Sequence, residues 1–135
     1  MSAEENKVLV LRACQLISDR NITALAELIH EDGSWSIPYR TDMFPYAGQK
    51  NKEAECAMLR QFLGGFDKFF FSVTSVVAEG DRVAAEVQSK GTGPGTAEYA
   101  NIYHMIFIIK DQKIHTVREY LDPFQVTAYV AQMQR

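Results

Sequence analysis

Three chemically reactive side chains alternate near the end of the sequence. Arg118, Tyr120 and Asp122 are each separated by one residue in the segment VREYLD. Because alternate side chains of a strand point to the same side, we expect all three on one face of a sheet. A carboxylate can remove a proton, a phenol can donate to an oxygen, and a guanidinium can orient the carboxylate. The spacing therefore predicts either a catalytic cluster with Asp122 as the base or the polar rim of an ordinary sheet.

Asp122 has a second interpretation, which follows from its neighbour. It precedes Pro123, and this pair is typical of a helix start, where the carboxylate accepts hydrogen bonds from the backbone. A capping carboxylate would meet the backbone of residues 124 and 125, whereas a catalytic one would point into an enclosed apolar pocket. Both interpretations stay open on the sequence.

The first half of the chain is predicted to be mainly helical. Apolar residues recur at the spacing of one helix face over residues 10–17 and again over 22–29, with HEDG and its Gly33 ending the second stripe. A short strand is expected at 34–37 and a third helix over 51–63.

The second half changes to the period of a strand. Two strands are expected over residues 68–92, turning at 79–82, and two more over 98–121, turning at 110–113. A short helix is expected at 122–133. Helices ahead of an antiparallel meander are typical of an α+β fold, in which the helices cover one face of a curved sheet.

Both faces of the third long strand are apolar. The first face carries Ile102, Ile106 and Ile108, and the second carries Tyr103, Met105, Phe107 and Ile109. One face can meet the helices, and the other needs a different cover. A second copy of the sheet is the simplest cover, so the pattern predicts a homodimer.

Composition narrows the class of protein. The 135 residues are 47% hydrophobic with a net charge of −3, which argues against a nucleic-acid partner. The polar N-terminus and the lack of a long apolar run predict a cytoplasmic protein without a membrane partner. Cys14 and Cys56 lack zinc-site spacing, and the GTGPG loop lacks the context of a phosphate cradle. We therefore expect neither a metal nor an organic cofactor.

The layout and three segments resemble the SnoaL-like group of the nuclear-transport-factor-2-like superfamily. These segments are DGSWSIP, YAGQKNKEA and NIYHMIFIIKDQKI…REYLD, and the resemblance covers nearly the whole chain. It implies one domain over residues 1–135. It also implies a cone, in which a strongly curved antiparallel sheet wraps around three N-terminal helices and leaves an apolar cavity. Such proteins include polyketide cyclases, ketosteroid isomerases, epoxide hydrolases of the limonene type and binding domains without catalysis.

The resemblance also bears on individual residues. EYLD matches the ends of a cyclase motif, Glu-His-Trp-Asp, and this match implies that Asp122 is the acid/base residue. The catalytic aspartate of the ketosteroid isomerases corresponds to Ile37, so their mechanism is not expected here. Arg118 and Asp122 lack the tight Arg-x-Asp spacing of the limonene-type hydrolases.

A ligand site is implied by the same resemblance. The side chains expected at the cavity mouth, or packed between the loop and the third helix, are Trp35, Tyr39, Phe44 and Tyr46. Asn101 and Tyr103 are expected to bind a ligand oxygen. The hypothesis is a cofactor-free cyclase, isomerase or hydrolase acting on a small, mainly apolar molecule. The alternative is a non-catalytic ligand-binding or dimerisation domain.

Overall fold

The computed structural model describes residues 1–133 and begins with two helices. Helix α1 (Ala3–Ser18) starts at a capping box, in which the Ser2 hydroxyl accepts from the Glu5 backbone N–H and the Glu5 carboxylate accepts from the Ser2 N–H. Helix α2 (Ile22–Leu28) starts where the Asn21 side chain accepts from a backbone N–H. Both helices lie where the apolar spacing predicted them.

Strand β1 (Ile29–Ile37) follows α2 directly and is longer than expected. HEDG was expected to stop a helix, but it belongs to this strand. A Cβ at Gly33 would lie 2.8 Å from the His30 carbonyl oxygen and 3.2 Å from that of His115. Gly33 is therefore required by the close approach of backbones at an irregularity between β1 and a neighbouring strand. Helix α2 does end at Leu28, directly before this segment, but Gly33 lies within a strand and is not the residue that stops the helix.

A loop over residues 38–47 leads to the short strand β2 (Gly48–Asn51) and to helix α3 (Lys52–Gly64). The Asn51 side chain accepts from the Ala54 backbone N–H and so caps α3. The predicted third helix is thereby confirmed.

Four long strands and a helix complete the chain. They are β3 (Lys68–Glu79), β4 (Arg82–Thr92), β5 (Glu98–Lys110), β6 (Lys113–Leu121) and α4 (Pro123–Met133). Strands β5 and β6 are joined by Asp111 and Gln112 alone, both with positive φ (53° and 64°), as in a tight hairpin turn.

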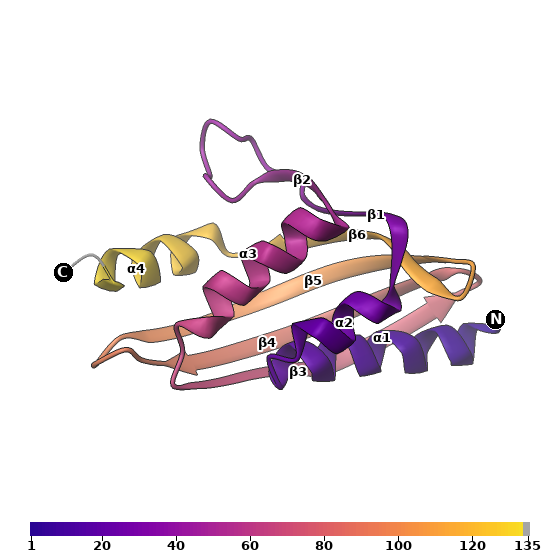
Figure 1. Ribbon diagram of the computed structural model, residues 1–135, viewed down its shortest axis with the longest axis horizontal. Helices are drawn as coiled ribbons and strands as arrows, with labels where there is room; N and C mark the ends of the chain where they lie inside the picture. Colours follow the sequence, from indigo (N-terminus) through magenta and orange to yellow (C-terminus); the bar gives the residue numbers. More distant parts are fainter. Residues whose placement is uncertain (134–135) are drawn as a thin grey trace.

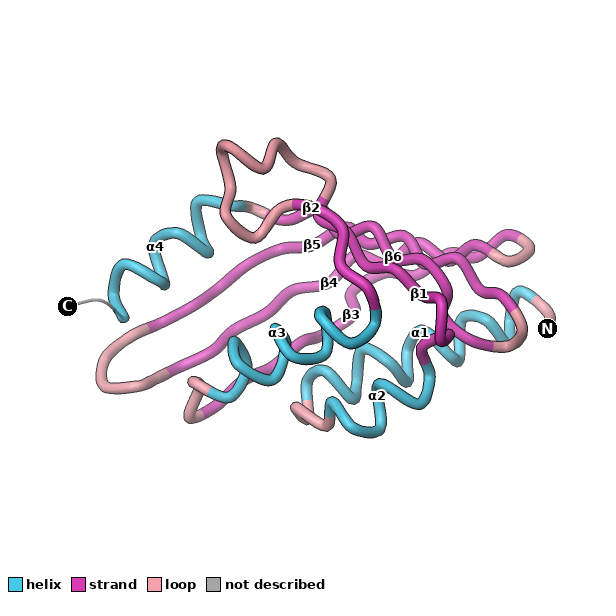
Figure 2. Tube along the Cα trace, turned by 45° about the horizontal axis from the view of Figure 1, so that its top comes forward, coloured by secondary structure: helices cyan, strands magenta, loops and turns pink. Residues whose placement is uncertain are grey.

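The six strands form one curved sheet in the order β2-β1-β6-β5-β4-β3. Helices α1, α2 and α3 lie on one side of it, and α4 packs beside β5 (Figures 1 and 2). The predicted α+β fold is confirmed. One neighbouring pair departs from the expected antiparallel sheet, because β1 runs parallel to β6.

The two faces of the sheet differ in burial. On β5, Tyr103, Met105 and Phe107 point to the helices and are buried, whereas Ile102 on the opposite face is 65% exposed. We call the side facing the helices the inner face and the other the outer face. The predicted division of β5 between two faces is confirmed, and its inner side chains help to form the core.

Candidate functional site

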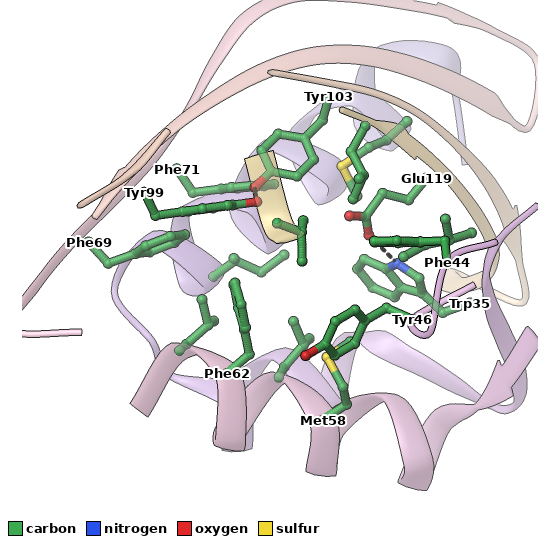
Figure 3. A pocket seen from close by; sticks show the side chains of 17 residues that line it. Trp35, Phe44, Tyr46, Met58, Phe62, Phe69, Phe71, Tyr99, Tyr103 and Glu119 are labelled. Carbon is green, nitrogen blue, oxygen red and sulfur yellow. Dashed lines mark hydrogen bonds between the residues drawn. The ribbon is translucent and has the colours of Figure 1, made fainter. Parts of the chain in front are cut away.

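A cavity lies between the inner face of the sheet and helix α3 (Figure 3). The volume open to the centres of water molecules is about 70 Å³, which leaves room for a small molecule. Its walls are almost entirely apolar and rich in aromatic rings. The lining residues are Ile17, Trp35, Ile37, Phe44, Tyr46, Met58, Leu59, Phe62, Leu63, Phe69, Phe71, Tyr99, Tyr103, Met105, Glu119, Leu121 and Val126.

Glu119 is the one charged side chain among the described residues that line this cavity. Strand β6 turns it inward together with Val117 and Leu121. The Trp35 indole Nε1 donates to the Glu119 Oε1 at 2.8 Å (Figure 3). Trp35 is in place because β1 pairs with β6 at Val117. The carboxylate is therefore held in one orientation inside an apolar space.

The surroundings of Glu119 act on its pKa in two directions. Burial raises the pKa of this carboxyl, while the hydrogen bond from Trp35 and the positive charge of Lys50 oppose the rise. Lys50 stands beside Trp35 across the β1–β2 pair. A carboxylate with a raised pKa is a stronger base than an exposed one, so this group suits proton transfer.

Two tyrosines supply the hydroxyl groups at another part of the wall. The Tyr99 and Tyr103 oxygens are 2.9 Å apart, and Figure 3 shows both pointing inward. Burial raises the pKa of Tyr99 to about 12 and that of Tyr103 well above its usual value. Both phenols therefore stay protonated at neutral pH and can act as hydrogen-bond donors.

A second carboxyl, Glu55 on α3, is buried near this region. Its side chain is 2% exposed, and its Oε2 has no hydrogen-bond partner among the described residues. Burial raises the pKa of Glu55 to about 9, with a smaller contribution from the Glu119 charge. Glu55 is therefore neutral at pH 7 and adds no second negative charge beside Glu119. Within residues 1–133, no cluster of His, Cys, Asp and Glu is suited to a metal ion.

The residues predicted to be catalytic lie elsewhere. Tyr120 is 41% exposed, and Arg118, Tyr120 and Asp122 are absent from the cavity wall. The Asp122 Oδ1 accepts from the Phe124 backbone N–H at 3.0 Å, which is the geometry of a helix cap. In the described part of the chain, no hydrogen bond joins Arg118 to Asp122. The trio lies on the outer side of β6 and its end, and a catalytic role for it stays a prediction.

The residues predicted to bind a ligand divide into two groups. Trp35, Phe44, Tyr46 and Tyr103 line the cavity.

Tyr39 and Asn101 instead brace the end of β6. The Tyr39 hydroxyl donates to the Leu121 carbonyl oxygen at 2.6 Å and accepts from the Leu121 N–H at 2.7 Å. Asn101 bonds the backbone of Asp122 through both ends of its amide. The structure thus gives these two residues contacts with the chain rather than a place on the wall.

Several wall residues were missed by sequence reasoning. Glu119 and Tyr99 provide most of its polar chemistry, and Met58 and Phe62 come from α3. A signal for Glu119 was present, because Val117 and Leu121 on either side of it mark an apolar face. A single acidic residue that alternates with apolar residues on one face of a strand is the pattern that could have identified Glu119.

Comparison with known proteins places the chain in a family. Residues 10–117 match the SnoaL-like domain. UPF0523 protein C of Dictyostelium discoideum is 23% identical over 142 residues, covering 96% of this chain and 91% of that protein.

Two solved structures share the fold. Bal32a, from a soil-derived mobile gene cassette, has a TM-score of 0.79 and 24% identity, covering 94% of this chain and 97% of its own. An LEH-like epoxide hydrolase of M. tuberculosis has a TM-score of 0.75 and 14% identity, covering 96% of this chain and 92% of its own. With the family match over most of its length, the chain belongs to the SnoaL-like domain family.

Proposed function

We propose that this protein is a cofactor-free acid/base enzyme, an isomerase or cyclase, that moves a proton on a small, mainly apolar molecule carrying a carbonyl oxygen. The observation that carries the proposal is Glu119, a single carboxylate fixed by Trp35 in an apolar cavity. Tyrosine hydroxyls in the same wall supply hydrogen-bond donors.

The chemistry follows from these two kinds of group. Glu119 removes a proton from the carbon next to the carbonyl, and the electron pair of that C–H bond moves toward the carbonyl oxygen. A tyrosine hydroxyl donates a hydrogen bond to that oxygen as its negative charge develops. Where a C=C bond adjoins the deprotonated carbon, Glu119 returns the proton to the far carbon of the resulting dienolate, and the double bond moves into conjugation with the re-formed carbonyl. Where the molecule carries a second carbonyl, the enolate carbon attacks the carbon of that carbonyl, the π bond of that C=O breaks, and its oxygen takes the proton from Glu119 as the ring closes. The apolar wall keeps water away from both steps.

Membership of the family supports the reaction class without selecting the substrate. Proteins of this fold include cyclases, isomerases and hydrolases. One fold hosts many activities, so the proposal depends on the site of this chain rather than on its relatives.

The proposal is tested by hydrogen exchange in D₂O. Cyclohexanone, a compact ketone of a size suited to the cavity, is incubated with the native protein, and deuterium incorporation beside the carbonyl is followed by NMR. We expect saturable exchange above the rate in matched acetate buffer. Saturable binding of the ketone without faster exchange would contradict the enzyme and favour a ligand-binding domain.

A second candidate role, dimerisation, is favoured by the outer face of the sheet. Several large apolar side chains are exposed there, namely Phe70, Val77, Ile102 and Tyr120. A neighbouring hollow on the same face is lined in part by Ile102 and Tyr120. We propose that a second copy of the chain covers this face, because a two-fold interface uses the same patch from both partners.

The dimer gives an expected mass and an expected way to disrupt it. Light scattering at micromolar concentration should give twice the chain mass of 15.3 kDa. Ile102→Asp should yield a monomer, because it places a charge within an interface that needs upwards of about 1,000 Å² of buried surface. Val8→Asp is the matched control, since Val8 is also 65% exposed but belongs to α1, which covers the inner face of the sheet. A native monomer would contradict the interface.

A further inference from the structure

Four buried polar groups form a continuous chain beside the cavity. The Ser89 hydroxyl lies 2.9 Å from the Tyr103 hydroxyl, which lies 2.9 Å from the Tyr99 hydroxyl. The Asn101 Nδ2 lies 2.8 Å from the Tyr99 oxygen. Of the four, only Tyr99 and Tyr103 reach the cavity wall. Because each hydroxyl has one proton, the directions of the two end bonds of this chain can be determined by accounting for the protons.

Asn101 fixes the first bond. Its Oδ1 accepts from the backbone N–H groups of Ile102 at 2.8 Å and Asp122 at 3.1 Å, and its Nδ2 also donates to the Asp122 carbonyl oxygen. If the Asn101 amide were turned by 180°, its NH₂ group would face the backbone N–H groups of Ile102 and Asp122, and donors would meet donors. Nδ2 therefore donates to Tyr99, and the proton of Tyr99 points elsewhere.

Ser89 fixes the second bond. It is buried, and Tyr103 is its side chain's one hydrogen-bond partner within residues 1–133. If Tyr103 donated to Ser89, the Ser89 proton would be buried without an acceptor, which is unfavourable. Ser89 therefore donates to Tyr103. The hydroxyls of Ser89, Tyr103 and Tyr99 have three protons but form only two hydrogen bonds with one another. Because the Ser89 proton is used in one of these bonds, one phenol proton stays free at the cavity.

The proton count allows two arrangements, in which Tyr103 donates to Tyr99 or Tyr99 donates to Tyr103. In the first, Tyr99 accepts from both Tyr103 and Asn101 and keeps its own proton free, and two accepted bonds polarise a hydroxyl as a donor. In the second, Tyr103 keeps the free proton.

We propose that the chain is directed from Ser89 through Tyr103 to Tyr99, so that Tyr99 alone offers a free proton to the oxygen of a bound molecule. Tyr103, Ser89 and Asn101 are then positioning residues, which orient and polarise the Tyr99 hydroxyl. The site selects a ligand with a hydrogen-bond acceptor at this end. This deepens the proposed function, but its test is a binding measurement that needs no turnover.

The test compares two molecules of one shape. Cyclohexanone carries an acceptor oxygen, and methylenecyclohexane carries a CH₂ group in its place. By NMR titration, the native protein should bind the ketone about tenfold or more tightly than the alkene, as one buried hydrogen bond allows. Tyr99→Phe should remove most of this preference and reverse the downshift of the bound carbonyl stretching band. Tyr103→Phe and Ser89→Ala should lower the preference by only about threefold or less.

Three results would overturn the proposal. All three are binding measurements, so they can be distinguished from a failure of Glu119 to remove a proton. An equal or larger loss in Tyr103→Phe would place the free proton on Tyr103. A stronger ketone preference in Ser89→Ala would mean that the chain runs the other way. A native protein that binds the ketone no better than the alkene would mean that no proton is free.

A second measurement applies to the protein without any ligand. In tyrosine labelled with ¹³C at Cζ, in mixed H₂O and D₂O, a slowly exchanging hydroxyl gives two Cζ signals and a rapidly exchanging one gives a single signal. We expect Tyr103 to exchange more slowly than Tyr99, because the Tyr103 proton is held between two oxygens. The reverse order would contradict the assigned direction.

Discussion

Glu119→Gln is expected to lower the rate of α-deuteration of a bound ketone by about 10²–10⁴-fold, the usual contribution of a general base. Glutamine keeps the shape of the side chain, and its Oε1 can still accept from the Trp35 indole. It cannot remove a proton. Ketone binding should therefore persist while exchange is lost, as NMR in D₂O would show. The native rate should also fall as the pH drops through the raised pKa of Glu119, because protonation removes the base.

Asp122→Asn is the matched control for this experiment. It removes a carboxylate three residues along the chain, and asparagine caps helices about as well as aspartate. We expect it to keep native stability and exchange, because the Asp122 carboxylate accepts from the Phe124 N–H outside the cavity. Loss of exchange in Asp122→Asn with retention in Glu119→Gln would reverse the assignment and restore Asp122 as the base.

Glu55→Gln is expected to remove most of a pH-dependent loss of stability. The pKa of Glu55 is about 9 in the folded protein against 4.5 ordinarily, so the unfolded chain releases this proton first. The contribution of the protonated Glu55 carboxyl to the free energy of unfolding is fully present below about pH 4.5, and it is lost as the pH rises toward 9. Between pH 4.5 and 7 the loss is about 3 kcal/mol, from 1.36 kcal/mol per pKa unit.

The measurement is urea unfolding of the native protein and the variant across that pH range. Between pH 4.5 and 7, the free energy of unfolding of the native protein should fall by about 3 kcal/mol relative to that of Glu55→Gln. Glu53→Gln is the control, since Glu53 is an exposed acid on the same helix. An equal pH dependence in the native protein and Glu55→Gln would show that Glu55 ionises freely in the fold.

Local patterns predicted most of the elements in this chain. The apolar spacing over residues 10–17 and 51–63 corresponds to α1 and α3, and the alternation along β5 separated Tyr103 from Ile102 correctly. These features depend on neighbours a few residues apart, which the sequence displays directly.

The candidate site was predicted less well because its contacts are distant in the sequence. The Trp35–Glu119 hydrogen bond joins residues 84 positions apart, and it depends on the parallel pairing of β1 with β6. The alternation of apolar residues in either strand does not indicate which strand it pairs with. The reactive types at Arg118, Tyr120 and Asp122 indicated chemistry, yet they lie on the opposite side of the strand from Glu119. Residue type alone did not say which face would meet the helices.

The two-residue turn at Asp111 and Gln112 has a consequence for how this family of sequences can evolve. Together with a one-residue register shift between Ile108 and Ile109, it sets the register of β6 against β5, and the register decides which side chains of β6 face inward. Substitutions within the turn leave the inherited site intact, provided that they tolerate positive φ. A one-residue insertion that shifted the whole strand would turn Glu119 outward and bring Arg118 or Tyr120 to the cavity. The length of a distant turn thus helps to determine the polarity of the pocket.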